Sequence, residues 1–195
     1  MSETLPLFPL STLLYPGGRL ALRLFEPRYL DMLTRCFKED SGFGVVLLEN
    51  GSEVGADQSF FNVGTEARIV DWGQGDDGML HITARGGRRF AVEASETRED
   101  NLVVGAVSWL VEPDDAQVPE AYAYLAEFLD KLIERTGADI ELSDAERSSA
   151  LALGYRLAEV LPLEARAKVE LLASSDPIER LQQFDELFQQ AAVED

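Results

Sequence analysis

The chain has 195 residues, of which 46% are hydrophobic and 27% charged, the ordinary range for a soluble globular protein. Its 17 Lys and Arg against 36 Asp and Glu give a net charge of −19, which repels phosphate backbones and anionic lipid surfaces and so disfavours general nucleic-acid binding. The single cysteine excludes an internal disulfide, and no apolar run is long enough to cross a membrane. We therefore expect a cytoplasmic protein without a membrane span.

The first forty residues predict a strand, a turn, a second strand and a helix in close succession. Two prolines hold residues 5–10 extended, while the leucines between them supply side chains that can be buried. Pro16 and Gly17 form a turn signal. Pro27 fits the first turn of a helix, where its missing N–H costs little, and apolar residues recur at helical spacing over residues 27–38.

The rest of the first half is rich in β-branched and aromatic residues, in short runs that glycines separate. Residues 73–78 and the pair Gly86-Gly87 are typical of hairpin turns, and the second is short enough to pair residues 79–85 with residues 88–94. Several short strands at this rhythm predict a small barrel or a folded sheet. Strands are expected at residues 43–48, 60–72, 79–84, 89–94 and 102–111.

Past Glu112 the periodicity changes from strand to helix. Residues 113–118 predict a linker between a β-rich domain of residues 1–112 and a helical domain of residues 119–195. Acidic residues dominate from Glu112 to Glu146, which indicates a solvated helical surface or, as the alternative, a docking face for a basic partner. Four helices are expected: one that Gly137 ends, one with a Ser143–Glu146 capping box that Pro162 stops, one over residues 163–173 and one that begins at Asp176 and Pro177.

Seven motifs follow one another along the chain, at residues 5–10, 25–29, 43–46, 63–69, 86–90, 161–163 and 175–181. The first reads LPLFPL, the second FEPRY and the last SDPIERL. Together and in this order they resemble the substrate-binding N-terminal domain of Lon proteases, over nearly the whole chain. The resemblance implies an α+β fold: a PUA-like mixed β-barrel or folded-sheet domain with one helix, followed by a C-terminal α-helical bundle. It also implies the recognition of unfolded polypeptide segments or of a partner protein, linked to proteolysis but without cleavage.

The sequence offers little catalytic chemistry. A full Lon protease also carries an AAA+ ATPase module and a Ser–Lys protease domain, and we expect this chain to be a free-standing module without either. The phosphate-binding pattern Gly-x-x-x-x-Gly-Lys-Ser/Thr does not occur. His81, the only histidine, is expected on the surface of a strand, and Cys36 as a buried small hydrophobe. No catalytic residue, cofactor or metal is therefore expected, and an enzyme with an unrecognised pocket for a small molecule is the alternative.

Aromatic residues are the first group of candidate binding residues, because aromatic contacts carry much of the energy of protein recognition. Phe25, Tyr29 and Trp72 are expected at the junction of the two halves, where clefts tend to form, and burial in the core is the alternative for each. Acidic surroundings should favour basic and apolar segments there. Residues 25–29 are also expected to serve structure, with Glu26 or Arg28 tying the start of the helix to the β-domain.

Arg85, Arg88 and Arg89 are the second group and form the one basic cluster of an acidic chain. Pairing with neighbouring carboxylates is the structural interpretation. The functional alternative is a PUA-like protein that binds RNA or a small ligand through this cluster, which the net charge opposes. A contiguous exposed patch of all three arginines would favour that alternative.

Overall fold

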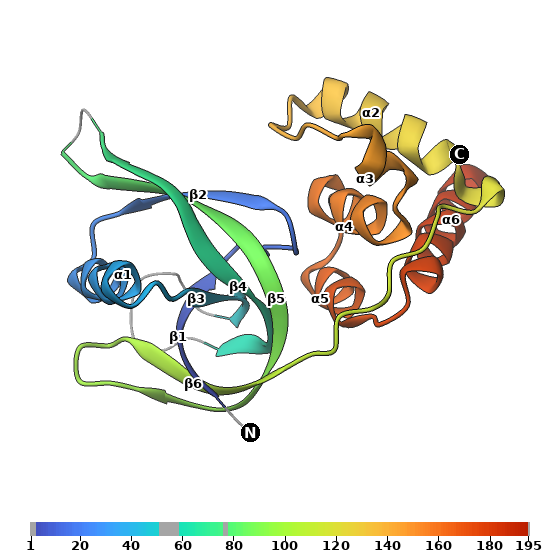
Figure 1. The fold of residues 1–195 in the computed structure, drawn as a ribbon. Coiled ribbons are helices and arrows are strands. Elements are labelled where there is room, and N and C mark those ends of the chain that lie inside the picture. Colours follow the sequence, from blue (N-terminus) through green and yellow to red (C-terminus); the bar gives the residue numbers. More distant parts are fainter. Residues whose placement is uncertain (1–2, 51–58, 76–77, 195) are drawn as a thin grey trace. The chain divides into compact units, whose positions relative to one another are not determined.

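In a computed structural model the chain forms two compact units, residues 1–110 and residues 111–195 (Figure 1). The structure describes residues 3–50, 59–75 and 78–194. The first unit is built mainly of strands and the second of helices, which confirms the mixed α+β class. Within the described ranges, no helix is both long enough and apolar enough to span a membrane.

The described part of the first unit has six strands, which are β1 (Glu3–Leu10), β2 (Arg19–Leu24), β3 (Phe43–Asn50), β4 (Ser59–Gln74), β5 (Leu80–Thr97) and β6 (Val103–Trp109). They form one sheet in the order β2-β5-β4-β3-β1-β6, and β5 also pairs with β6. The sheet therefore closes into a ring of β5, β4, β3, β1 and β6, with β2 paired to the start of β5 on the same edge that β6 occupies further along the strand (Figure 1). β1 and β3 are parallel, and β1 and β6 are antiparallel.

Two apolar clusters stabilise the first unit. Helix α1 (Pro27–Glu39) contributes Met32 and Leu33 to one cluster, where they pack with buried residues of several strands. The other cluster joins buried residues of β1, β3, β5 and β6. Leu7 belongs to this second cluster and its neighbour Phe8 to the first, so both faces of β1 are buried. A strand covered on both faces explains why the opening motif is apolar almost without interruption.

The predicted helix is confirmed. It begins at Pro27, as expected, and runs one residue past the expected end. Asp40 follows in the left-handed conformation (φ 48°), and its N–H donates to a carbonyl of the last turn. On the buried side of the helix, Tyr29 stacks on Phe8 of β1 with ring centroids 3.7 Å apart. This stacking anchors the first turn of α1 on the sheet.

The predicted hairpin at Gly86 and Gly87 is wrong, because β5 passes through both glycines without reversing. The turn before β2 approaches this point so closely that an added Cβ at Gly86 would overlap the carbonyl oxygen of Tyr15. Two backbone hydrogen bonds hold the approach, from the Gly17 N–H to the Gly86 carbonyl and from the Gly86 N–H to the Gly18 carbonyl, both 2.9 Å long. The glycine therefore marks a close contact between two segments rather than a turn.

The other predicted hairpin is confirmed, since residues 75–79 join β4 to its antiparallel neighbour β5. The Gly75 N–H donates to the Met79 carbonyl at 2.9 Å, and Gly78 has a positive φ of 77°. Residues 76 and 77 of this segment lie outside the described residues.

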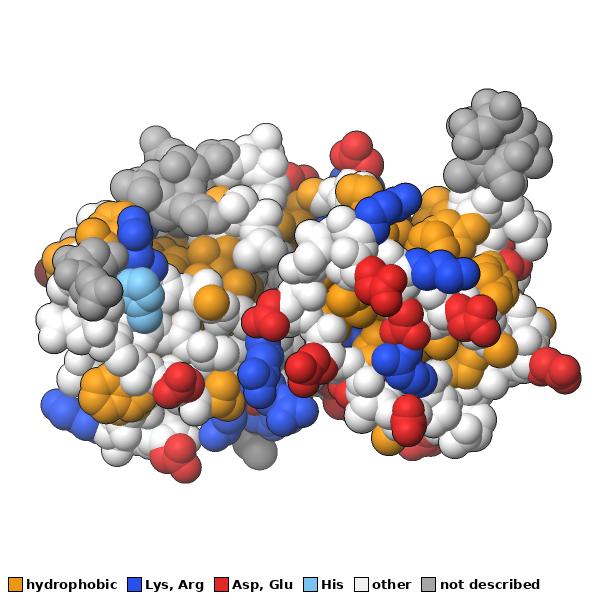
Figure 2. Space-filling view, turned by 90° about the horizontal axis from the view of Figure 1, so that it is seen from above, with side chains coloured by type: hydrophobic (Ala, Val, Ile, Leu, Met, Phe, Trp, Pro, Cys, Tyr) orange, Lys and Arg blue, Asp and Glu red, His pale blue; other side chains and the backbone are white. Residues whose placement is uncertain are grey.

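The second unit contains one helix more than the four predicted, within the part that the structure describes. The segment with the capping box at Ser143 and Glu146 divides in two, because Ser149 adopts an extended conformation and its hydroxyl accepts the Ala152 N–H at 2.9 Å, which starts a new helix. Figure 2 shows charged side chains of both signs interspersed with hydrophobic ones over the displayed face of this unit. The elements are η1 (Glu120–Tyr122), α2 (Tyr124–Thr136), α3 (Asp144–Ser148), α4 (Ala150–Val160), α5 (Ala165–Ala173) and α6 (Pro177–Glu194).

Arg180 of α6 is fully buried in the second unit. Its guanidinium donates to the carbonyls of Leu171 at 2.9 Å and Ser174 at 2.7 Å, both at the end of α5. The same group lies over the Tyr155 ring of α4, 4.2 Å from the ring centroid. One side chain therefore connects three helices.

Candidate functional site

The start of α1 serves structure, as expected for residues 25–29. The buried guanidinium of Arg28 donates to the Glu26 carboxylate at 2.9 Å and to the carbonyl of Asn101 at 2.7 Å. The second bond ties the helix to the turn before β6, so the expected link to the strands is confirmed. Tyr29 is buried in the core, which is the alternative to its being a binding residue. Phe25 is 58% exposed.

An exposed apolar surface lies where β4 and α1 meet. Trp72 of β4 is 64% exposed, and its ring contacts that of Phe37 of α1 with centroids 5.7 Å apart. Val70, also on β4, is 54% exposed. We call Phe37, Val70 and Trp72 the apolar edge. Helical spacing alone does not reveal Phe37 as a surface residue, because it continues the buried stripe of α1.

The apolar edge borders a length of strand that has a neighbour on one side only. β4 pairs with β3 over residues 59–67 and with β5 over residues 63–74. Among the described strands, residues 68–74 therefore have β5 on one side and no strand on the other. The Trp72 N–H donates to the Asp71 carboxylate at 2.9 Å, so this backbone donor is occupied by a side chain. Such a side of a strand can accept the backbone of another chain.

The predicted arginine cluster is not one patch. Arg85 is exposed, whereas Arg89 is only 1% exposed. Arg88 pairs with the Glu66 carboxylate at 3.4 Å and lies over the Trp109 ring, 3.7 Å from its centroid. Arg88 therefore pairs with a neighbouring carboxylate, as the structural interpretation of the cluster predicts. The contiguous patch that would favour RNA binding by these three residues is absent from the described surface.

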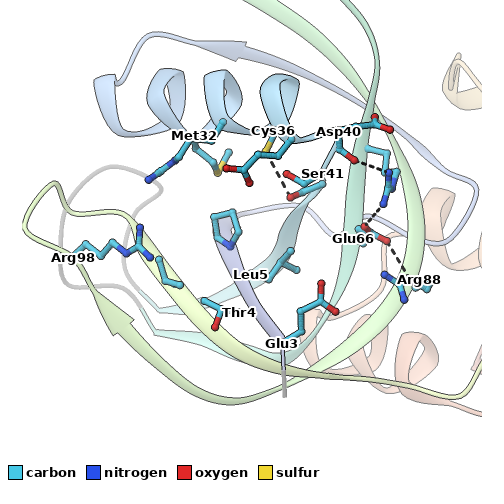
Figure 3. Close-up of a pocket in the computed structure, with 16 residues that line it drawn as sticks. Glu3, Thr4, Leu5, Met32, Cys36, Asp40, Ser41, Glu66, Arg88 and Arg98 are labelled. Carbon is cyan, nitrogen blue, oxygen red and sulfur yellow. Dashed lines mark hydrogen bonds and ion pairs between the residues drawn. The ribbon is translucent and has the colours of Figure 1, made fainter. Parts of the chain in front are cut away.

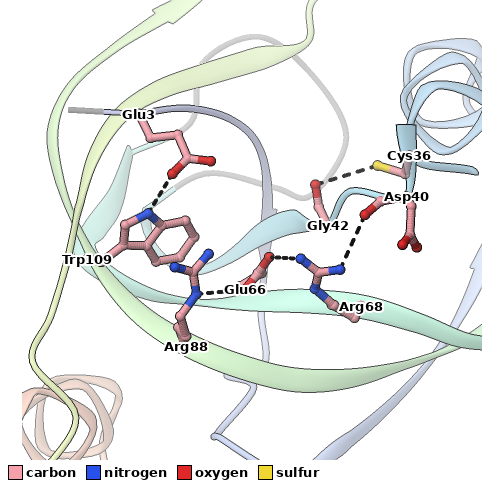
Figure 4. Close-up of polar contacts among 8 residues, drawn as sticks. All are labelled: Glu3, Cys36, Asp40, Gly42, Glu66, Arg68, Arg88 and Trp109. Atoms are coloured by element: carbon pink, nitrogen blue, oxygen red, sulfur yellow. Dashed lines mark hydrogen bonds and ion pairs between the residues drawn. The ribbon is translucent and has the colours of Figure 1, made fainter. Parts of the chain in front are cut away.

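Glu66 is the centre of a polar network that the sequence did not reveal (Figure 4). Its carboxylate is 6% exposed and pairs with Arg88 and, at 3.2 Å, with Arg68. Arg68 also donates to the carbonyl of Asp40, which follows α1, so the network joins β4, β5 and the end of the helix. Alternation along β4 could have shown that Glu66 and Arg68 share a face, but not that one of them is buried.

A cavity of about 360 Å³ opens beside this network. Figure 3 shows its labelled side chains converging from α1, from β1 and from the strands around Glu66. Four arginines and four carboxylates line it, so its lining carries no net charge. The lining residues are Glu3, Thr4, Leu5, Pro6, Met32, Arg35, Cys36, Glu39, Asp40, Ser41, Gly42, Glu66, Arg68, Arg88, Arg98 and Val104.

Cys36 is buried beside this cavity, as the sequence predicts. Its thiol donates to the Gly42 carbonyl at 3.6 Å, and burial raises the pKa of the Cys36 thiol, outweighing the hydrogen bond from Ser41. A thiol reagent such as DTNB should therefore label the folded protein slowly at neutral pH and react fully after denaturation. Since the chain has one cysteine, the released chromophore has a single source, and rapid labelling of the folded protein would contradict this burial.

The remaining candidate groups of the sequence are the histidine and the side chains that could bind a metal. His81 lies exposed on β5, as expected for a histidine on a strand surface. No three His, Cys, Asp or Glu side chains of the described residues come close enough to share a metal ion. The expected site at the junction of the two halves stays a prediction.

Comparison with known proteins identifies relatives over almost the full chain. The family model of the ATP-dependent protease La (LON) substrate-binding domain matches residues 4–190. A Lon protease of Cytophaga hutchinsonii is 27% identical over an alignment of 189 positions, which covers 91% of this chain and 23% of that protein. This chain therefore spans less than a quarter of the length of that relative.

Solved structures agree with this match. A Lon N-terminal domain protein from Xanthomonas campestris is 37% identical, with a TM-score of 0.75 over 93% of this chain and 96% of that one. The N-terminal domain of a Mycobacterium avium complex Lon protease shares the fold at 20% identity, with a TM-score of 0.61 over 92% of this chain and 95% of that one. On the match to residues 4–190 and these structures, the chain belongs to the Lon substrate-binding domain family.

Proposed function

We propose that the chain is a non-catalytic module that holds extended, apolar segments of unfolded polypeptide along the apolar edge. The family supports a role in binding protein. The observation that carries the finer proposal is the contact between the exposed rings of Trp72 and Phe37 beside the open side of β4. In this proposal the first unit is a PUA-like barrel, the second is a helical bundle, and the protein acts in the cytoplasm.

Binding by strand addition accounts for a preference for unfolded chains. An incoming segment would form backbone hydrogen bonds with residues 68–74, which a folded protein cannot offer unless it has an open edge of its own. Alternate side chains of that segment would reach Trp72 and Phe37. The Asp71 carboxylate would have to release the Trp72 N–H, so binding costs one hydrogen bond before it gains several.

Charge should select among unfolded segments. The chain carries a net charge of −19, and Asp71 lies within the open stretch of β4. Segments that combine apolar and basic residues should therefore bind more tightly than apolar segments with acidic neighbours, and salt should reduce the difference.

Replacing Trp72 by alanine should weaken binding of a reduced, unfolded model substrate about tenfold, because exposed aromatic anchors carry much of the free energy of such contacts. Fluorescence anisotropy of the labelled substrate measures the dissociation constant. Trp72→Ala should leave the fold intact, since the Trp72 side chain is mostly exposed. The emission of Trp109, the other tryptophan of the chain, checks this.

Tyr124→Ala is the matched control, because Tyr124 is 41% exposed and lies in the second unit. It should bind the unfolded substrate as the native protein does. The same substrate in its folded, oxidised form should bind neither protein measurably. Equal affinity for the folded and unfolded forms, or an equal loss in both variants, would remove the proposed site.

A further inference from the structure

Three arginines stand directly opposite one another across β2, β5 and β4. Arg19 pairs in register with Arg85, and Arg85 pairs with Arg68 on its other side. Residues directly opposite in adjacent antiparallel strands project from the same face of the sheet, so these side chains form one row. We call Arg19, Arg85 and Arg68 the arginine row.

The register places the backbone positions of the arginine row on the face of the sheet opposite the cluster that contains α1, and the Arg68 guanidinium also reaches the Asp40 carbonyl after that helix. The sequence neighbours Leu20, Ala84 and Ile69 belong to or pack on the cluster that contains the residues of α1, and side chains alternate along a strand. All three arginines are accordingly exposed. Further along the same face, Arg23 stands opposite His81.

Negative charge on this face is sparse. The next row contains Ala21, Thr83 and Asp71, and Asp71 is the one carboxylate that the register places among the described residues of these rows. Glu66 pairs with Arg68 from within β4, but it is shared with Arg88. This face is locally positive, although the chain as a whole carries a net charge of −19.

Like charges directly opposite one another destabilise a sheet, so the pairing of Arg19 with Arg85 opposes folding, whereas the charge of Arg68 is compensated by Glu66. Residues that break such a local rule without a structural gain commonly serve a function. We propose that the arginine row docks a short acidic segment of a partner protein, whose carboxylates pair with the guanidinium groups. Guanidinium groups fit carboxylates bidentately, which gives this pairing geometric specificity as well as attraction.

An acidic protein segment suits this face better than a nucleic acid. The register places no Phe, Tyr or Trp side chain in the rows of Arg19, Ala21 and Arg23, and His81 is the one aromatic ring there, whereas single-stranded nucleic acids bind by stacking successive bases on several aromatic rings. A long polyphosphate would also meet the repulsion of the remaining acidic surface, which a short peptide largely escapes because salt screens charges beyond about 8–10 Å. The proposal is independent of the apolar edge, which lies on the other face and favours basic segments.

A fluorescent peptide of alternating glutamate and serine is the probe, and anisotropy with the full chain measures its binding. Arg85→Gln should weaken binding about fivefold, and Arg19→Gln together with Arg85→Gln more strongly. Arg98→Gln is the matched control, because it removes the same charge from an exposed position of the first unit outside the row. It should leave the affinity within about twofold of native. Binding should weaken steeply as salt rises.

Two further measurements separate this role from others. Arg85→Gln should keep or raise the melting temperature, because it relieves repulsion within the row, and a lowered melting temperature would mean that Arg85 serves the fold. Trp72→Ala should leave binding of the acidic peptide unchanged, so that failure here and failure at the apolar edge are distinguishable. The proposal is overturned if the native protein does not bind the peptide, if Arg98→Gln weakens binding as much as Arg85→Gln, or if a single-stranded oligonucleotide of equal charge binds more tightly.

Discussion

Replacing Arg180 by alanine should lower the free energy of unfolding of the second unit by about 4 kcal/mol. The change removes a fully buried side chain and leaves a cavity between α4, α5 and α6. It also removes the hydrogen bonds that the carbonyls of Leu171 and Ser174 accept from the guanidinium. Each buried carbonyl left without a partner costs about 1–3 kcal/mol, and the packing of the stem against the Tyr155 ring is lost as well.

Urea unfolding followed by amide hydrogen exchange over α4, α5 and α6 measures this effect within the second unit. A probe confined to that unit is needed, since a chain with two compact units need not unfold in one step. Arg166→Ala is the control, because Arg166 is an exposed arginine of α5 whose loss should change stability by no more than about 0.5 kcal/mol. An Arg180→Ala effect as small as the control would show that the arginine does not hold the three helices together.

Gly86→Ala should destabilise the first unit by at least about 3 kcal/mol. The added methyl group would overlap the backbone of Tyr15, with the carbonyl carbon only 2.9 Å from it, and backbone cannot rotate away as a side chain can. Relief would require β5 and the turn before β2 to separate, which breaks the two hydrogen bonds of Gly86 with Gly17 and Gly18.

Tryptophan fluorescence is a specific probe for this variant, because both tryptophans of the chain, Trp72 and Trp109, lie in the first unit. Gly73→Ala provides the comparison, since nothing lies within 4 Å of the position that a Cβ would take there. Its unfolding midpoint in urea should stay close to native. A Gly86→Ala protein that unfolds at the same urea concentration as Gly73→Ala would contradict the close approach of the two segments.

The sequence revealed most of the local structure, because local signals determine it. Pro27 marked the start of α1, and Ser143 with Glu146 marked a helix start that the structure confirms. What failed depends on contacts between distant residues. Gly86 has the same local signature whether the chain turns there or another backbone approaches it, and Ser149 divides a helix while its backbone pairs with Gln117, far back in the chain.

The candidate surfaces show the same limit. The sequence predicted Phe25, Tyr29 and Trp72 as binding residues at the junction of the two halves, but only register and burial separate exposed Trp72 from buried Tyr29. Neighbouring positions drew attention to Arg85, Arg88 and Arg89, whereas the structure aligns Arg85 with Arg19 and Arg68, which lie far from it in sequence. Strand pairing between distant segments is not encoded in a short window of residues.

The place of β1 in the sheet has a consequence for folding during synthesis. β1 leaves the ribosome before the other described strands, yet Glu3 finds its partner Val107 only when β6 has been synthesised. During that interval one edge of the apolar strand has no neighbour and can pair with the wrong chain. Strand pairing over such a long stretch of sequence also slows folding. Of the described strands, β1 thus stays longest without its final neighbour. It is the strand that most needs shielding from other chains during translation.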